Sequence, residues 1–213
     1  MFSSDNALTG SINTLFNPSS QKKLSNIDVS RNSLSGGIDA SIFELPSLTS
    51  FAAVSNCIDL GPGGLSSLRA CAAIKLQALI LDGLSASPSC QDRFFPRSQR
   101  LNSYSPKFQV VSTIPVCLFA MPSLQTLHLS GNGIRGSLES DLQISPSMRS
   151  LSVSYNQLVG NIPRAFQQHT WSNIDLSYNK LTGKGKATNS LVSMISCLLF
   201  LKSQCHVCVM KAL

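Results

Sequence analysis

Residues 124–183 repeat one pattern three times: LQTLHLSGNGIRGSL (124–138), MRSLSVSYNQLVGNIP (148–163) and WSNIDLSYNKLTG (171–183). Each copy has apolar residues at its first, fourth and sixth places, asparagine at its ninth, an apolar residue at its eleventh and glycine at its thirteenth. The copies begin at Leu124, Met148 and Trp171, so the interval between them is nearly constant. Self-similarity at a fixed period of roughly 20 to 50 residues indicates a solenoid of stacked coils.

Each copy has the features of one coil. Apolar and polar residues alternate around the fifth place, as in Leu127-His128-Leu129, and this period of two predicts a short strand with one buried face. A coil this small cannot bury its apolar residues alone, so its neighbours must complete the core. The amide of the ninth-place asparagine can bond the backbone of its own turn and of the adjacent coil. We expect such a ladder from Asn32, Asn56, Asn132, Asn156 and Asn179.

Further copies precede these three. LSNIDVSRNSLSGGI (24–38) keeps the full register, and the next copy begins at Leu48. Another strand is expected over 76–81, but Leu84 stands at its ninth place and should interrupt the asparagine ladder. Residues 6–12 match only the second half of a repeat, without its strand. Because the ends of a solenoid need polar caps, we expect the chain to be a fragment, with the solenoid over residues 1–183.

Residues 85–113 interrupt the pattern and allow two interpretations. The coils that begin at Leu76 and Leu124 are separated by twice the usual interval, which leaves room for a degenerate repeat around Leu101. The alternative is an inserted island loop, because no apolar triplet with the required spacing occurs there. The segment is rich in aromatic and basic residues, which are enriched at interfaces, although its phenylalanines could instead fill the core of an eroded coil.

The pattern L-x-x-L-x-L-S-x-N-x-L-x-G-x-I-P resembles the plant-type subclass of leucine-rich repeats over roughly residues 6–183. This subclass forms the ectodomains of receptor-like kinases and receptor-like proteins, and the polygalacturonase-inhibiting proteins. The resemblance implies an α/β solenoid with a parallel β-sheet on its concave face and irregular or 3-10 segments on its convex face. The isoleucine-proline pair of the pattern occurs at 114–115 and 162–163.

The resemblance also implies where a ligand would bind. In this family, ligands commonly contact the side chains that alternate outward from the concave sheet. Tyrosine is frequent at binding hot spots, but an aromatic residue before the turn asparagine could simply cover the edge of the core. The expected binding residues are Asp28, Arg31, Asp82, His128, Ser152, Tyr155, Asp175 and Tyr178.

No catalytic constellation is visible in the sequence. His128 is the only one of the three histidines that lies on an expected strand. The serine near it, Ser130, occupies the seventh place of its copy, and serine also occurs at this place as Ser30, Ser154 and Ser177. A recurring serine is better explained by structure than by nucleophilic catalysis. No phosphate-binding glycine loop or kinase motif occurs. We therefore expect a protein that is not an enzyme and has no cofactor.

The net charge of +7 does not indicate a nucleic-acid-binding protein. Residues 184–213 contain four of the 17 lysines and arginines and none of the acidic residues, and the repeats contain no basic cluster interleaved with aromatics. The expected partners are a protein, peptide or glycan, with no nucleic acid.

The cysteines allow two readings. Cys57, Cys71, Cys90 and Cys117 could form disulfides in an oxidising compartment, for instance Cys57 with Cys71 or Cys90 with Cys117, or they could be buried free thiols. Cys205 and Cys208 lack a second ligand pair, so no metal site is expected.

Residues 184–213 form a tail that does not match the repeat pattern and that is apolar and basic. Its apolar run over 190–201 is shorter than the about 20 residues that cross a bilayer. Membrane association is therefore expected only through a missing or partial segment. The tail could also be a gene-model artefact, a translated intron after Gly183. Residues 1–23 contain no signal peptide pattern.

These observations predict a non-catalytic protein- or ligand-binding module of a cell-surface or secreted leucine-rich-repeat recognition protein. One alternative is the ectodomain portion of a receptor-like kinase whose kinase domain is missing from this chain. Another is an intracellular scaffold, for which the location would be cytoplasmic and not extracellular. Free thiols in the native protein would favour the scaffold, because disulfides are rare in the cytosol.

Overall fold

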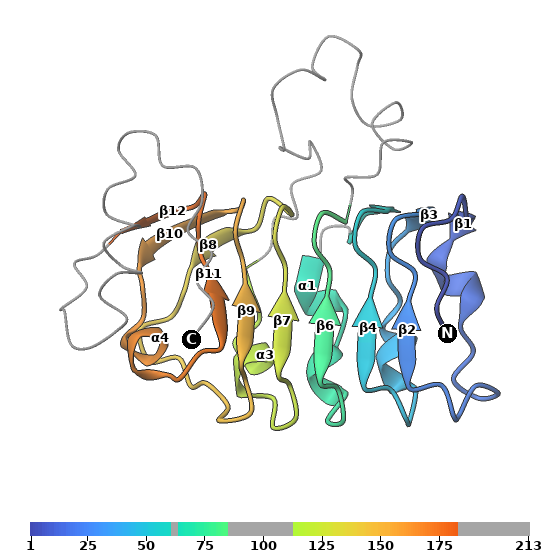
Figure 1. The fold of residues 1–213 in the computed structure, drawn as a ribbon, viewed down its shortest axis with the longest axis horizontal. Helices are drawn as coiled ribbons and strands as arrows, with labels where there is room; N and C mark the ends of the chain where they lie inside the picture. Colours follow the sequence, from blue (N-terminus) through green and yellow to red (C-terminus); the bar gives the residue numbers. More distant parts are fainter. Residues whose placement is uncertain (61–63, 85–112, 183–213) are drawn as a thin grey trace, which may run out of the picture.

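The computed structural model describes residues 1–60, 64–84 and 113–182. Their main element is a parallel sheet of six short strands that lie side by side (Figure 1). In sheet order the strands are β2 (Asn26–Asp28), β4 (Ser50–Ala52), β6 (Ala78–Ile80), β7 (Thr126–His128), β9 (Ser150–Ser152) and β11 (Asn173–Asp175). Each coil contributes one strand, so sequence order and sheet order coincide.

The central residue of every strand points into the solenoid. Strand register aligns these residues in a single inward row, formed by Ile27, Phe51, Leu79, Leu127, Leu151 and Ile174. All of them except Ile174 are fully buried. The backbone ladder continues beyond the strands, for example from Gly131 N–H to the Ser154 carbonyl at 3.0 Å. The alternating pattern in the sequence thus produces a continuous core along the axis.

The amino terminus extends this ladder. Ser3 N–H donates to the Asp28 carbonyl at 2.8 Å, and Asp28 N–H donates to the Met1 carbonyl at 3.0 Å. The sequence predicted that the first half-repeat would lack a strand. That prediction is wrong in part, because residues 1–5 pair with the edge of β2 even though they carry little of the apolar signature.

Two smaller parallel sheets follow the asparagine turns. One contains β1 (Thr9–Ser11), β3 (Ser33–Gly36) and β5 (Cys57–Ile58), and the other contains β8 (Arg135–Ser137), β10 (Gln157–Asn161) and β12 (Lys180–Thr182). The resemblance to plant-type repeats implied only irregular or 3-10 structure after the turn. Glycine and polar residues make up most of these strands, so no period-two pattern of apolar residues marks them in the sequence.

The thirteenth-place glycines allow these small sheets to stack closely. Gly136 has φ of +93°, and a Cβ there would lie 2.6 Å from Thr113 Cγ2 in the preceding coil. Gly160 has φ of +82°, and its added Cβ would lie 3.3 Å from Ser137 Cβ. Glycine is therefore required both by the backbone conformation and by the space between coils.

Short helices complete the coils. They are η1 (Ile12–Leu15), η2 (Ala40–Glu44), α1 (Gly64–Ser67), η3 (Ala70–Ala72), α3 (Cys117–Ala120) and α4 (Arg164–Gln168). Aromatic contacts fill the interior behind them, as where Phe166 packs edge-on against Trp171 with ring centroids 5.7 Å apart. The parallel sheets and 3-10 segments confirm the predicted α/β solenoid.

Strands β6 and β7 are adjacent although the chain between them is long. Ala78 pairs with Thr126 and Ile80 with His128, so no strand from the intervening residues lies between them in the sheet. Residues 85–112, including Cys90, lie outside the described residues, as does the chain from Gly183 to Leu213. The expected island and tail therefore fall almost entirely in those two segments.

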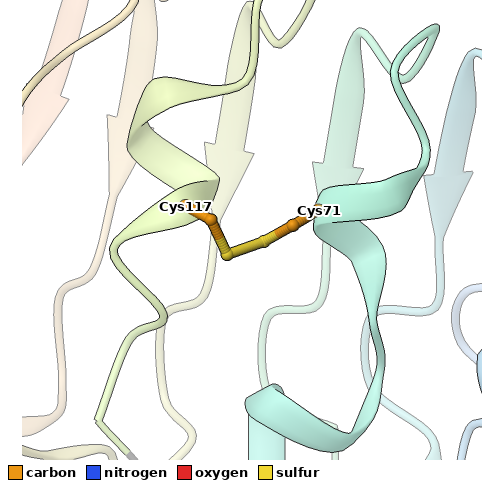
Figure 2. Close-up of a disulfide and its surroundings, with 2 residues drawn as sticks. All are labelled: Cys71 and Cys117. Atoms are coloured by element: carbon orange, nitrogen blue, oxygen red, sulfur yellow. A yellow bond between two sulfur atoms is a disulfide. The ribbon is translucent and has the colours of Figure 1, made fainter.

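A disulfide joins the two coils that flank this interruption. Cys71 in η3 is bonded to Cys117 in α3, with their Cα atoms 5.8 Å apart (Figure 2). Both suggested pairings, Cys57 with Cys71 and Cys90 with Cys117, are therefore wrong. Stacking brings equivalent parts of neighbouring coils together, whereas Cys57 in β5 and Cys71 in η3 belong to different elements of one coil. Cys57 is also disulfide-bonded.

Within the described ranges, no helix has both the length and the apolar character needed to span a bilayer. The same part of the chain contains no group of three or more His, Cys, Asp or Glu residues that could hold a metal ion.

Candidate functional site

The outward side chains of the six-stranded sheet form a broad surface, which we call the outer face. Cross-strand pairing arranges them in rows. The first row contains Asn26, Ser50, Ala78, Thr126, Ser150 and Asn173, and the second contains Asp28, Ala52, Ile80, His128, Ser152 and Asp175. Four of the expected binding residues, Asp28, His128, Ser152 and Asp175, thus share one row.

The centre of the outer face holds a polar chain across three coils. His128 Nε2 lies 2.9 Å from Ser150 Oγ, and His128 Nδ1 lies 3.9 Å from Asp82 Oδ2. Asp82 Oδ1 accepts a hydrogen bond from Ser130 N–H at 2.5 Å. His128 pairs in register with Ser152, but its ring instead reaches Ser150. A side chain's direction within a row depends on its rotamer, which the repeat pattern does not specify.

Burial raises the pKa of Asp82 above the usual aspartate range, and the charge of Asp175 acts in the same direction. The Ser130 N–H and the imidazole of His128 oppose this shift by stabilising the carboxylate. Asp82 is thus a partly desolvated acid whose ionised form would gain from a nearby positive charge.

The order Asp82, His128 and Ser150 resembles an acid, base and nucleophile, but its geometry does not fit acyl transfer. The 3.9 Å separation between Asp82 and His128 exceeds hydrogen-bond distance. Backbone amides near Ser150 are already used by the sheet, since Ser150 N–H donates to the Gln125 carbonyl at 2.9 Å. An oxyanion would need such donors to be available. The arrangement is better suited to polar recognition.

Serine hydroxyls extend this polar region toward β11. Ser130 Oγ lies 2.6 Å from Ser152 Oγ, and Ser154 Oγ donates to Ser130 Oγ at 3.1 Å. On the next coil, Ser177 Oγ donates to Asp175 Oδ1 at 2.6 Å. The recurring seventh-place serine therefore links neighbouring coils. Asp175, which was expected to bind a ligand, also accepts from the Ser177 backbone N–H at 3.0 Å.

The other half of the outer face is apolar. Ala52 and Ile80 are neighbours in the second row, Ala78 lies in the first row, and Val54 follows β4 by two residues. We call these four residues the apolar patch. None of the expected binding residues belongs to this patch.

Tyr155 and Tyr178 stack beyond the ends of β9 and β11. Their ring centroids are 4.0 Å apart at an interplanar angle of 13°, and they remain 42% and 37% exposed. Both residues adopt the left-handed conformation, with φ of 52° and 51°. Such φ values are uncommon for bulky residues. The stack places two aromatic rings at the surface at some cost in backbone strain.

Arg31 occupies the position equivalent to these tyrosines in its own coil, with φ of 53°. Its guanidinium pairs with Asp5, with Nη2 lying 2.7 Å from Asp5 Oδ2. The side chains are 66% and 57% exposed. Arg31 is thus engaged with the amino-terminal segment, two coils away from Asp82.

The ninth-place asparagines stabilise the turns, and their side chains are directed into the protein and not toward a ligand. Asn156 Nδ2 donates to the Leu129 carbonyl in the preceding coil at 2.9 Å and to the Val153 carbonyl in its own turn at 2.9 Å. Leu84 stands where the other copies have asparagine, and its backbone N–H donates to Asn132 Oδ1 in the following coil at 2.9 Å. The asparagine of the following coil therefore still bonds the turn at Leu84.

A second concavity lies away from the six-stranded sheet, beside β8 and β10. Its volume is about 560 Å³, and its lining includes Glu139, Asp141 and Arg164. The repeat pattern offered no signal for it, because its lining residues follow the thirteenth-place glycines, beyond the places that the copies share.

Comparisons with known proteins find similarity to leucine-rich-repeat proteins. The Leucine Rich Repeat family model matches residues 123–143 and 147–169. The structure is similar to the leucine-rich-repeat ectodomain of the plant membrane receptor kinase GASSHO1/SCHENGEN3 from Arabidopsis thaliana, solved in complex with CASPARIAN STRIP INTEGRITY FACTOR 2. That match has 28% identity and a TM-score of 0.62, and it covers 86% of this chain and 19% of the receptor chain.

Two further solved structures share the fold. A plant ice-binding protein is 24% identical with a TM-score of 0.64, over 87% of this chain and 51% of its own. The PEPR1-AtPEP1 structure is 20% identical with a TM-score of 0.63, over 85% of this chain and 21% of its own. This chain therefore spans only part of the length of each of these proteins. No curated protein is significantly similar to it in sequence.

Proposed function

Because the chain is a leucine-rich-repeat protein of the plant type, we propose that it is a non-catalytic module that binds a protein or peptide ligand on its outer face. The observation that carries this proposal is the outer face itself. Six aligned strands present an apolar patch, a central acid and imidazole, a hydroxyl network and a tyrosine stack on one continuous surface. Clusters of this kind are typical of recognition surfaces.

The parent protein is proposed to be a cell-surface or secreted recognition protein. The ectodomain of a membrane receptor kinase that this chain resembles was solved with a bound partner, which supports protein or peptide binding here. The Cys71–Cys117 disulfide supports an oxidising, extracellular compartment over a cytoplasmic one. Mass spectrometry of the native protein without reductant tests the location, because free thiols at both positions would favour the intracellular scaffold.

A receptor-like kinase is the alternative parent. This chain resembles part of the leucine-rich-repeat ectodomain of a membrane receptor kinase, which supports such a parent. Sequencing the complete transcript tests this alternative. A downstream transmembrane helix followed by kinase motifs would select it, whereas a transcript that encodes only repeats would select the secreted form.

Residues 85–113 are proposed to be an island loop inserted between two coils. The direct pairing of β6 with β7 supports this over a degenerate repeat, which would ordinarily add a strand to the sheet.

The binding proposal can be tested by blocking the outer face. Ser152 lies on β9, beside His128 in the second row, so Ser152→Tyr should place a bulky ring next to the Asp82–His128 region and weaken binding of selected peptide ligands at least tenfold. Ser140 is exposed beside the second concavity, and Ser140→Tyr is the matched control. If the two variants bound such ligands equally well, the outer face would not be the binding site.

A further inference from the structure

Resting on the proposed binding function, we propose that the outer face selects an extended peptide that carries an apolar residue and, about two positions away, a lysine or arginine. The apolar residue packs on the apolar patch of β4 and β6. The basic residue contacts the carboxylate of Asp82, with Asp175 adding to the attraction.

The apolar patch is an exception among the outward positions. In the first row, strands β2, β7, β9 and β11 present Asn26, Thr126, Ser150 and Asn173, whereas β6 presents Ala78. In the second row, β4 and β6 present Ala52 and Ile80, between Asp28 on one side and His128 on the other. Ala52 is buried, with 8% of its surface exposed, so the half-buried Val54, Ala78 and Ile80 supply the accessible part of the patch. Accessible apolar side chains bordered by polar groups form a surface on which an apolar ligand residue can pack.

Charge complementarity identifies the second part of the ligand. The outward positions in the described coils carry Asp28, Asp82 and Asp175, and among those positions the only lysine or arginine is Arg31. Arg31 is already paired with Asp5. The acidic face therefore contrasts with the net charge of +7 of the whole chain. A cationic ligand side chain would complement this face, while an acidic one would be repelled.

Asp82 is the carboxylate best placed for the contact. One of its oxygens is held by Ser130 N–H, and the other lies 3.9 Å from the His128 ring without forming a hydrogen bond to it. Because the group is partly desolvated, an additional positive charge interacts with it more strongly than with a fully hydrated surface aspartate. Burial of Asp82, which raises its pKa, is consistent with an uncompensated carboxylate.

The spacing of the two features fits an extended chain. The centre of the apolar patch lies between β4 and β6, and the Asp82–His128 pair lies between β6 and β7. The pair is thus displaced from the patch by one strand across the sheet and by up to two residues along the strand direction. With strands about 4.8 Å apart, this offset is about 5 to 8 Å. Alternate side chains of an extended peptide lie about 6.8 Å apart on one face. Six strands span about 24 Å, which corresponds to a peptide of about seven residues.

The experiment is selection of a random heptapeptide display library on the full 213-residue chain. We expect enrichment of sequences with an apolar residue and a lysine or arginine two positions apart. Selected peptides should bind Asp82→Asn and Ile80→Ser at least tenfold more weakly than the unchanged protein. The matched controls are Asp141→Asn and Ile74→Ser, which alter exposed residues away from the outer face and should leave binding unchanged.

The outcomes separate this inference from the proposed function. Peptides that lose binding to Ser152→Tyr but lack the apolar and basic pair would overturn the inference and leave the proposed function standing. Peptides whose affinity is unaffected by Ser152→Tyr, Asp82→Asn and Ile80→Ser would overturn both. An unchanged affinity for Asp82→Asn alone would remove the role of the carboxylate and overturn the inference.

Discussion

At the scale of single residues, the ninth-place asparagines show how one side chain connects two coils. Asn156 Oδ1 accepts from the backbone N–H groups of Asn132 and Ile134, at 3.1 and 3.0 Å, while its Nδ2 donates to carbonyls on both coils. Asn156→Ala would leave several of these buried groups unsatisfied, so we expect it to lower the free energy of unfolding by about 3 to 5 kcal/mol. Urea denaturation measures the loss.

Asn179 provides the comparison at this scale. Its Nδ2 donates to three carbonyls, as that of Asn156 does, but Asn179 is only half-buried, and its Oδ1 accepts from Leu158 N–H at 3.0 Å, whereas Asn156 Oδ1 accepts from two N–H groups. Asn179→Ala should therefore cost less, about 1 to 2 kcal/mol. Equal losses for the two variants would contradict the account in which burial and bond number determine the ladder's strength.

Asp82 should couple stability to pH. Its pKa is raised in the folded protein, chiefly by burial, so folding favours the protonated acid. Its contribution to stability is therefore fully present below the ordinary aspartate pKa of about 3.9 and is lost as pH rises through the folded value. The groups that face Asp82 are His128, Ser130 and Asp175. Asp82→Asn should accordingly be more stable than the unchanged protein at pH 7.

Thermal denaturation at pH 7 and at about pH 3.5 checks this prediction. The advantage of Asp82→Asn should disappear at the lower pH, where the carboxyl group is largely neutral in both folded and unfolded protein. The same variant is expected to bind selected peptides more weakly. A gain in stability together with a loss of binding is the pattern of a residue retained for function.

At the scale of elements, the Cys71–Cys117 disulfide joins η3 to α3 and connects the two coils on either side of the interruption. Its cysteines are separated by 46 positions in the sequence, so removing the bond would release a long loop in the unfolded chain. We expect the Cys71→Ser, Cys117→Ser double variant to lose about 2 to 4 kcal/mol of stability. Denaturant unfolding of this variant is the proper measurement, since a reductant would also affect Cys57, which is disulfide-bonded too.

The interruption between β6 and β7 yields a second prediction about elements. Strand β6 begins at Ala78 and β7 at Thr126, about twice the interval between other neighbouring strands of the sheet. Deleting one period of about 24 residues from within 85–112 restores ordinary spacing. If the segment is an island, the shortened protein, with any cysteine left unpaired replaced by serine, should fold with its sheet intact. Loss of the cooperative unfolding transition would instead favour a degenerate coil.

At the scale of the whole molecule, the repeat period predicted the solenoid because each copy must bury its apolar residues against the next one. The inward row from Ile27 to Ile174 follows from counting places in the sequence. The outward places of Asp28, His128 and Asp175 follow from the same alternation. The Asp82–His128–Ser150 arrangement does not, because side-chain rotamers are set by neighbours in other coils.

The sequence by itself determined the fold class, the core rows and the asparagine turns, since all three depend on a period that is visible in a single chain. Only the tertiary structure decided that Cys71 pairs with Cys117, that the amino terminus pairs with β2, and that two small sheets form behind the glycines. It also placed Asp82 beside His128 across the interruption. These features depend on which coils are adjacent in space, and a pattern within one coil carries no information about the side chains that its neighbour places beside it.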